Sequence, residues 1–177
     1  MNIKRLVLWF LIFCALFIYV LMFERTDAPQ PVAVLPAEKY ERVFPLEATD
    51  IIGLLVSNKK KTVRLARKDQ KMRLVEPTGM HVSDDLINSL LSAITETVML
   101  DELEPSDDQS LYGFNPPAFT VQVYTADKDE PQTLLLGANA PSRINMYAHL
   151  PQQSRIVLLG TYLRFTLKTF LDNVKKQ

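Results

Sequence analysis

Residues 111–124 read LYGFNPPAFTVQVY, and they indicate how the chain turns into a strand. The glycine tolerates the left-handed conformation that ends a helical turn, and the two prolines favour extended backbone. From residue 118 onward apolar and polar residues alternate, as they do in a half-buried strand. We therefore assign this stretch a structural role, in which its two aromatic side chains before the prolines anchor the corner in the core. The residues concerned are Tyr112, Gly113, Phe114, Pro116 and Pro117.

Strand patterns, either alternating or short and wholly apolar, occur on both sides of this stretch. Two other segments have the apolar period of a helix, one from the suitable N-cap Ser83 to about Thr97 and one from Gly160 to Val174. The strands follow one another through short polar turns, which implies antiparallel pairing. The predicted strands are residues 50–58, 62–66, 71–75, 118–125, 132–136, 144–150 and 155–159.

The order of these segments is three strands, a helix, four strands and a second helix. It predicts an α+β fold of antiparallel β-meanders with two packed helices, preceded by one N-terminal transmembrane helix. The repeated order also allows a duplication of a β-meander-plus-helix unit. Within the strands, alternation places Ile144 and Met146 in the core, and Gly137 is expected to end its strand.

The N-terminal segment from Leu6 to Phe23 consists of 18 consecutive apolar residues. A helix of that length spans roughly 27 Å, close to the hydrocarbon thickness of a bilayer. Lys4 and Arg5 precede the segment, which predicts a cytoplasmic N-terminus and a periplasmic remainder. We therefore predict a single-pass protein of the bacterial inner membrane, with a transmembrane signal-anchor helix at residues 1–25. A cleaved signal peptide is the alternative, but the long core and its bulky end favour an uncleaved anchor.

Residues 26–45 contain four prolines, which remove backbone donors and favour an extended spacer. We predict a linker there and an extracytoplasmic α+β domain at residues 46–177. The single cysteine, Cys14, lies in the apolar segment, so the sequence offers the domain no disulfide and no thiolate metal site. Beyond Lys4 and Arg5 the chain has 18 basic and 20 acidic residues, a balance that argues against a nucleic-acid-binding protein.

Four short motifs of the domain carry a family resemblance. They are MRLVEP at 72–77, YGFNPP at 112–117, LLLG at 134–137 and MYAHL at 146–150. In this order they resemble the family catalogued as domain of unknown function 4340, over roughly residues 46–172. Met72 stands where that family usually has tryptophan and Phe114 where it usually has leucine, and both keep a large apolar group. The resemblance implies an extracytoplasmic domain on a membrane anchor, often associated with ABC-type transport systems related to gliding-motility components, and it supplies no catalytic residues.

The segment at residues 58–73 is strongly basic, with one acidic residue, Asp69. On a hairpin, several of its cations share one polar face, which would suit anionic lipid headgroups or an acidic surface of a partner. The alternative is a solvated outer face, whose lysines discourage edge-to-edge aggregation. The cations of this predicted interaction patch are Lys59, Lys60, Lys61, Arg64, Arg67, Lys71 and Arg73.

The remaining polar features point to little chemistry. Residues 101–108 are acidic, but they lack the glycine and the spacing of an EF-hand, so we interpret them as a solvated loop that could also pair with the basic segment, within or between chains. His81 and His149 have no histidine or cysteine partner at ligand spacing. No GxSxG, HExxH or P-loop motif occurs. We therefore expect no enzyme activity, no cofactor and no metal site.

The sequence thus predicts a non-enzymatic, membrane-tethered periplasmic accessory or interaction domain, within an envelope or ABC-type transport assembly. Its expected partners are the lipid bilayer of the inner membrane and a membrane or envelope protein. The alternative is a binding domain for a lipid or another small envelope ligand. Such a domain would hold its ligand in a cavity lined by Phe114, Phe119, Met146 and Phe165.

Overall fold

The computed structural model describes residues 10, 13, 16, 17, 19, 40–104 and 109–176. They fall into two units, Met1–Lys39 and Tyr40–Gln177. The N-terminal transmembrane helix of the predicted fold class is not found: no helix among the described residues is long and apolar enough to cross a membrane, and most of residues 1–25 lie outside that set. The predicted linker also falls largely outside it.

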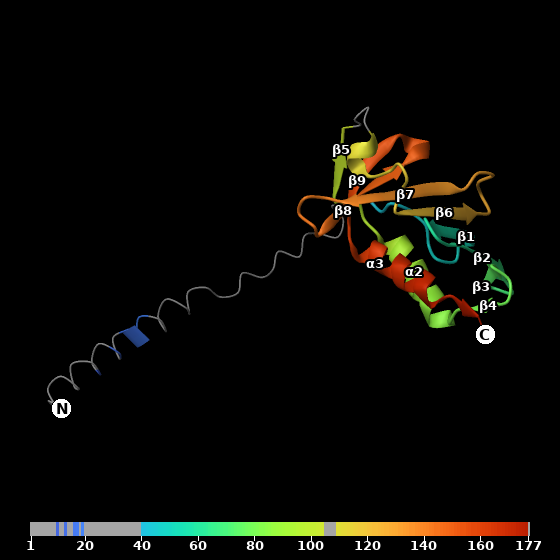
Figure 1. Cartoon of the computed structure of the whole chain (residues 1–177), viewed down its shortest axis with the longest axis horizontal. Coiled ribbons are helices and arrows are strands. Elements are labelled where there is room, and N and C mark those ends of the chain that lie inside the picture. Colours follow the sequence, from blue (N-terminus) through green and yellow to red (C-terminus); the bar gives the residue numbers. More distant parts are fainter. Residues whose placement is uncertain are drawn as a thin grey trace. The chain divides into compact units, whose positions relative to one another are not determined.

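The second unit is built on one eight-stranded sheet whose neighbouring strands are all antiparallel. The strand order is β3-β2-β1-β6-β7-β8-β9-β5 (Figure 1). A separate two-stranded sheet joins β4 (Met80–His81) and β10 (Lys175–Lys176). The large sheet consists of β1 (Ile51–Asn58), β2 (Thr62–Lys68), β3 (Lys71–Glu76), β5 (Asp101–Leu103), β6 (Phe119–Thr125), β7 (Gln132–Asn139), β8 (Asn145–Leu150) and β9 (Arg155–Gly160).

The two meanders that the sequence allowed as a possible duplication form one continuous sheet. β1 pairs with β6, so the meander β1–β3 and the meander β6–β9 meet in the middle of the sheet. The second meander is extended by β5, which pairs with β9 at the edge. The sequence pattern missed β5 because its three residues lie in the acidic stretch and show no apolar alternation. The fold is nevertheless α+β, an antiparallel sheet with two helices.

The two helices pack against each other on one face of the sheet (Figure 1). They are α2 (Asp84–Glu96) and α3 (Tyr162–Asn173). Helix α2 begins where the sequence predicted: the side-chain oxygen of Ser83 accepts a hydrogen bond of 3.4 Å from the backbone nitrogen of Leu86. Two aspartates occupy its first turn, where the helix dipole favours negative charge.

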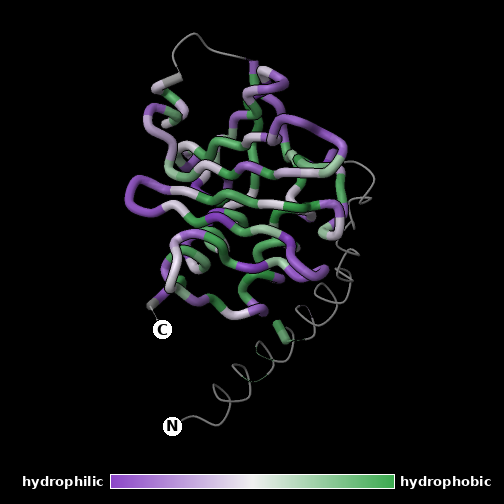
Figure 2. Tube along the Cα trace, turned by 90° about the vertical axis from the view of Figure 1, so that its right-hand side faces the viewer, coloured by the Kyte–Doolittle hydropathy of each residue, from purple (hydrophilic) through white to green (hydrophobic). Residues whose placement is uncertain are grey.

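The core lies between the helices and the sheet. Figure 2 shows hydrophobic residues recurring along the strands and hydrophilic residues at several of the turns between them. Strand alternation and the helix stripes supply the largest fully buried side chains, among them Leu54, Leu65, Leu134, Met146, Leu90, Ile94, Leu163 and Phe170. Val43 and Phe44, which precede the sheet, are also buried. Their segment is held by hydrogen bonds from Val43 N to the Thr97 carbonyl, at 2.9 Å, and from Met99 N to the Glu41 carbonyl, at 2.8 Å.

Two local expectations fail near the β7–β8 hairpin. Gly137 does not end its strand, because β7 continues to Asn139 with an irregularity in its pairing to β8 after Leu136. Ile144 is 71% exposed although it has the alternation of the buried Met146. Ile144 lies one residue before β8 begins, so it is outside the strand whose inward side chains pack in the core.

The YGFNPP motif lies on the face of the sheet that carries no helix. Gly113 has a φ of +73°, the left-handed conformation that the sequence predicted. Phe114 is buried, but its ring centroid lies 5.5 Å from that of His149, whose neighbours in β8 point to the main core. Because side chains alternate along a strand, Phe114 therefore packs on the helix-free face, outside the core between helices and sheet.

Candidate interaction surfaces

Two cations of the predicted patch hold the fold together. The ammonium of Lys61 donates hydrogen bonds to the carbonyls of Leu171 and Val174, at 2.8 and 2.7 Å, and so caps the C-terminal end of α3. The guanidinium of Arg67 donates to the carbonyls of Ile51, at 2.8 Å, Ala48, at 2.5 Å, and Gln70, at 2.9 Å. It ties the start of β1 to the β2–β3 turn. These two side chains are therefore structural.

Two further cations, Lys59 and Lys60, lie in the β1–β2 turn. The side-chain oxygen of Asn58 organises this turn by accepting hydrogen bonds from the backbone nitrogens of Lys60 and Lys61, at 2.9 and 2.8 Å. Nearby, the pKa of Asp172 is lowered, chiefly by its hydrogen bond from Lys168 and to a smaller extent by the charges of Lys61 and Lys60. The turn thus faces the end of α3.

The remaining three cations form what we call the basic face, which consists of Arg64, Lys71 and Arg73. Arg73 pairs with Ala66 across the β2–β3 ladder, so Arg73, Lys71 and Arg64 point to the same helix-free side of the hairpin. All three are exposed, and none belongs to an ion pair among the described residues. Their charge is available to a partner.

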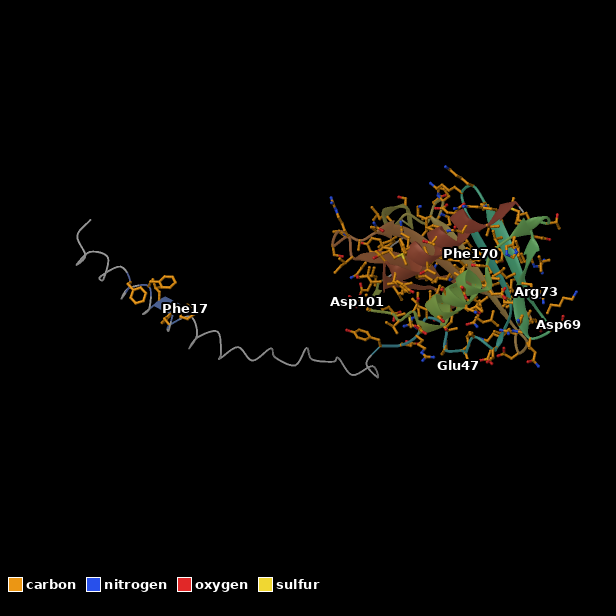
Figure 3. The ribbon with its side chains drawn as sticks, turned by 90° about the horizontal axis from the view of Figure 1, so that it is seen from below. Phe17, Glu47, Asp69, Arg73, Asp101 and Phe170 are labelled. Atoms are coloured by element: carbon orange, nitrogen blue, oxygen red, sulfur yellow. The ribbon has the colours of Figure 1, made fainter. Side chains whose placement is uncertain are left out.

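The described part of the acidic stretch, residues 101–104, forms no ion pair with the basic face. Asp101 belongs to β5, at the opposite edge of the sheet from β3, and Figure 3 shows it across the domain from Asp69 and Arg73. Glu102 instead binds Arg155 at 2.8 Å, and Glu41 binds the same guanidinium at 3.2 Å. The hydrogen bond from Arg155 lowers the pKa of Glu102.

Residues 105–108 of the acidic stretch lie outside the described residues. In the part of the chain that the structure describes, no three histidine, cysteine or acidic side chains gather as metal ligands would.

An aromatic cluster covers part of the helix-free face. The ring of Tyr112 contacts those of Phe114, at 5.9 Å, and Tyr147, at 5.0 Å between centroids, and Phe114 covers His149. The Nδ1 atom of His149 is buried and has no hydrogen-bond partner among the described residues. Burial lowers the pKa of His149, because a charged imidazolium would be poorly solvated there. His81 lies elsewhere, on β4.

Sequence reasoning missed a second exposed surface, which we call the apolar patch: Leu100, Ile144, Tyr162 and Phe165. Tyr162 and Phe165 are both 67% exposed on the first turn of α3, and the backbone nitrogen of Thr161 donates to the Ile144 carbonyl beside them. Leu100 and Tyr162 line a depression of about 230 Å³ together with Ala93, Glu96, Thr97, Val98, Gly160 and Leu163. A signal was present, since Tyr162 and Phe165 lie off the buried stripe of α3.

The four side chains proposed to line a ligand cavity do not come together. Phe119 and Met146 belong to the core between helices and sheet. Phe114 packs on the opposite face of the sheet, and Phe165 is exposed on α3. The structure therefore offers these residues no common cavity.

The chain is similar to a known family of domains. The model of a family described as a domain of unknown function (DUF4340) matches residues 73–177. The YGFNPP, LLLG and MYAHL motifs and all but the first residue of MRLVEP fall inside this range, whereas β1 and β2 fall outside it. No curated protein and no solved structure matches the chain.

Proposed function

The chain belongs to the DUF4340 family of domains of unknown function, and from this premise we propose that it is a non-enzymatic, membrane-tethered interaction domain of the bacterial cell envelope. The domain works on the periplasmic side of the inner membrane, as an accessory subunit of an envelope or ABC-type transport assembly. It acts by recognising a protein partner rather than by chemistry on a small substrate.

The observation that carries this proposal is the apolar patch. Leu100, Ile144, Tyr162 and Phe165 expose large apolar side chains around the start of α3, beside a depression that is mostly apolar. Soluble domains rarely leave such groups clustered at the surface unless a partner covers them. Aromatic side chains are also the residues that most often anchor protein–protein interfaces. The patch is therefore the part of the surface best suited to a protein partner.

The basic face supports the same function in a different way. Exposed, unpaired charges contribute modestly to affinity, but they accelerate association with an acidic partner and orient it. Arg64, Lys71 and Arg73 are located on the helix-free side of the sheet, whereas the apolar patch lies by the helices. The domain thus has two chemically distinct surfaces that one or two partners could use.

The proposed location rests on the N-terminal sequence. The apolar residues from Leu6 to Phe23 are preceded by Lys4 and Arg5, the charge pattern of a segment whose N-terminus stays in the cytoplasm. The prolines of residues 26–45 favour an extended spacer that would hold the domain clear of the membrane surface.

The test is chemical crosslinking in cells at native expression, followed by purification in mild detergent. A double variant, Tyr162→Ser with Phe165→Ser, removes the two aromatic groups of the patch. Leu111→Ser is the matched control, because Leu111 is equally exposed, at 67%, but lies outside the patch. We expect the unmodified chain and the control to retain a stoichiometric protein partner that the double variant loses. Recovery of all three as free monomers would overturn the proposal.

A further inference from the structure

One edge of the sheet is open. β3 is the last strand on its side, and among residues 40–104 and 109–176 no other strand pairs with its outer edge. An edge of this kind presents backbone N–H and C=O groups that an extended segment of another chain can bind.

The β2–β3 register identifies those groups. Asp69 and Gln70, with φ values of +51° and +62°, form the two-residue turn, and Lys68 pairs with Lys71 next to it. In such a hairpin the pair at the turn exchanges hydrogen bonds, and the next pair does not. Lys71 and Arg73 therefore bond to β2, and Met72 and Leu74 direct their backbone groups outward. Four backbone hydrogen-bonding groups are thus offered along this edge.

A groove runs beside the same edge. Two depressions of about 260 and 240 Å³ lie between β3 and the first turns of α2, the larger one bordered by β4 as well, and Met72 and Ile87 line both. These two side chains are buried, as is Val82 in the larger depression, so apolar groups form the floor. An extended segment that pairs with β3 would therefore place alternate side chains over a groove with a buried apolar floor, whose lining also includes His81, Asp84 and Asn88.

The charges at this edge are mainly positive. Lys71 and Arg73 project from β3 to the helix-free side, and Lys68 is adjacent across the turn. Among the described residues, three acids lie near these cations. Asp84 lines the groove at the start of α2, Asp69 belongs to the β2–β3 turn, and Glu76 at the end of β3 is the register partner of Arg64. Residues directly opposite each other on neighbouring strands point to the same face of the sheet. A residue of the bound segment opposite Lys71 or Arg73 would therefore be acidic, and one opposite Met72 or Leu74 would be apolar.

We propose that the free edge of β3 binds an extended acidic segment of a partner protein by antiparallel strand addition. The segment alternates acidic and apolar residues, with its apolar side chains over the groove and its carboxylates beside Lys71 and Arg73. The inference rests on the proposed function in treating the chain as an interaction domain, but it uses a surface separate from the apolar patch. All neighbouring strands of the eight-stranded sheet are antiparallel, and antiparallel addition would continue this arrangement.

The probe is a short synthetic peptide in which glutamate and valine alternate, added to the full chain in detergent. Residue-resolved amide hydrogen exchange is measured by NMR. We expect the peptide to slow exchange at Met72 and Leu74, whose amides point outward, and to change little at Lys71 and Arg73. A double variant, Lys71→Glu with Arg73→Glu, should weaken binding of the peptide by about tenfold or more. The same variant should gain binding of a peptide in which lysine replaces glutamate.

Two methylated peptides separate strand addition from simple charge attraction. In an antiparallel pair the valine nitrogens would face β3, so N-methylation of the valines should abolish binding, and N-methylation of the glutamates should not. Equal binding of both methylated peptides, or no binding of the parent peptide, would overturn the inference. The Tyr162→Ser and Phe165→Ser variant should bind the peptide normally. Failure at the β3 edge is therefore distinguishable from failure of the apolar patch.

Discussion

Gly137 is the residue that lets the YGFNPP loop lie on the sheet. A Cβ atom at this position would fall on the carbonyl oxygen of Tyr112 and lie 2.8 Å from the ring of Phe114. The first of these is a backbone atom, which cannot swing aside as the end of a side chain can. We expect Gly137→Ala to lower the free energy of unfolding by roughly 1–3 kcal/mol, measured by urea denaturation.

The matched control for that change is Gly160→Ala. Gly160 is the last residue of β9, and a Cβ there would meet no atom within 4 Å. The control should change the free energy of unfolding by no more than about 0.5 kcal/mol. Equal losses of stability for the two variants would show that the position of the YGFNPP loop does not depend on the absence of a side chain at residue 137.

His149 should make stability depend on pH. Its folded-state pKa lies below the ordinary value of 6.5 because burial disfavours the charged ring. The unfolded chain then binds more protons than the folded chain as the pH falls. The contribution of His149 to the free energy of unfolding is therefore fully present above the ordinary pKa of histidine and is lost as the pH falls through the folded-state pKa. We expect His149→Phe to reduce this loss, as measured by urea denaturation at about pH 7.5 and about pH 5. Replacement of the exposed His81 by Gln should leave the loss in place.

The residue scale also shows where sequence reasoning ends. Gly113 was predicted correctly because a left-handed turn is a local property of the chain. The need for Gly137 was not predicted, since it arises from a loop that is distant in sequence. Phe114 was predicted to be buried, but the sequence alone could not say which face of the sheet it covers.

At the scale of the elements, α3 is fixed near both ends by cations. Near its start, the guanidinium of Arg164 donates a hydrogen bond to the Gly137 carbonyl of β7. At its end, Lys61 caps the carbonyls of Leu171 and Val174. We expect Lys61→Met to lower the free energy of unfolding by about 2 kcal/mol, because it leaves helix-end carbonyls without their charged donor. Thermal denaturation followed by circular dichroism measures the change.

The control for this prediction is Lys59→Met in the same turn, which should have an effect within about 0.5 kcal/mol. If the two variants lose the same stability, the cap would contribute nothing beyond the general charge of the turn.

The contrast between Lys61 and Lys59 also bears on the predicted patch. Sequence reasoning treated its seven cations alike, because the contacts of Lys61 and Arg67 join segments far apart in the chain.

Elements with a local signal were predicted and those without one were not. The alternation of β2 and β6 and the cap of α2 depend on near neighbours, and each appears where the sequence placed it. β4, β5 and β10 are only two or three residues long, and they become strands through their partners in the sheet. The apolar patch was missed for a similar reason: whether an apolar side chain is exposed depends on which other elements pack against it, and the sequence does not show this.

At the scale of the whole molecule, the folded unit begins before the first strand. Val43 and Phe44 are buried, and their segment bonds to Thr97 and Met99. We expect a fragment of residues 46–177 to be less stable than one of residues 40–177 by about 3–5 kcal/mol, the usual cost of removing a buried aromatic side chain. Urea denaturation of the two fragments measures the difference. The point variant Phe44→Ala should reproduce most of it, and fragments of equal stability would contradict the role of this segment.

The range that matches the family model should not fold by itself. Residues 73–177 lack β1, β2 and the first two residues of β3, yet β1 lies in the interior of the sheet and pairs with β6 along most of its length. Without β1, the edge of β6 would be unpaired, and Leu54, Val56 and other core side chains would be missing. We expect a fragment of residues 73–177 to show no cooperative thermal transition by circular dichroism and poor dispersion of its amide NMR signals, whereas residues 40–177 show both. A cooperative transition in the shorter fragment would mean that the first meander is an addition to an independent unit. Its absence would mean that this sheet needs both meanders to fold.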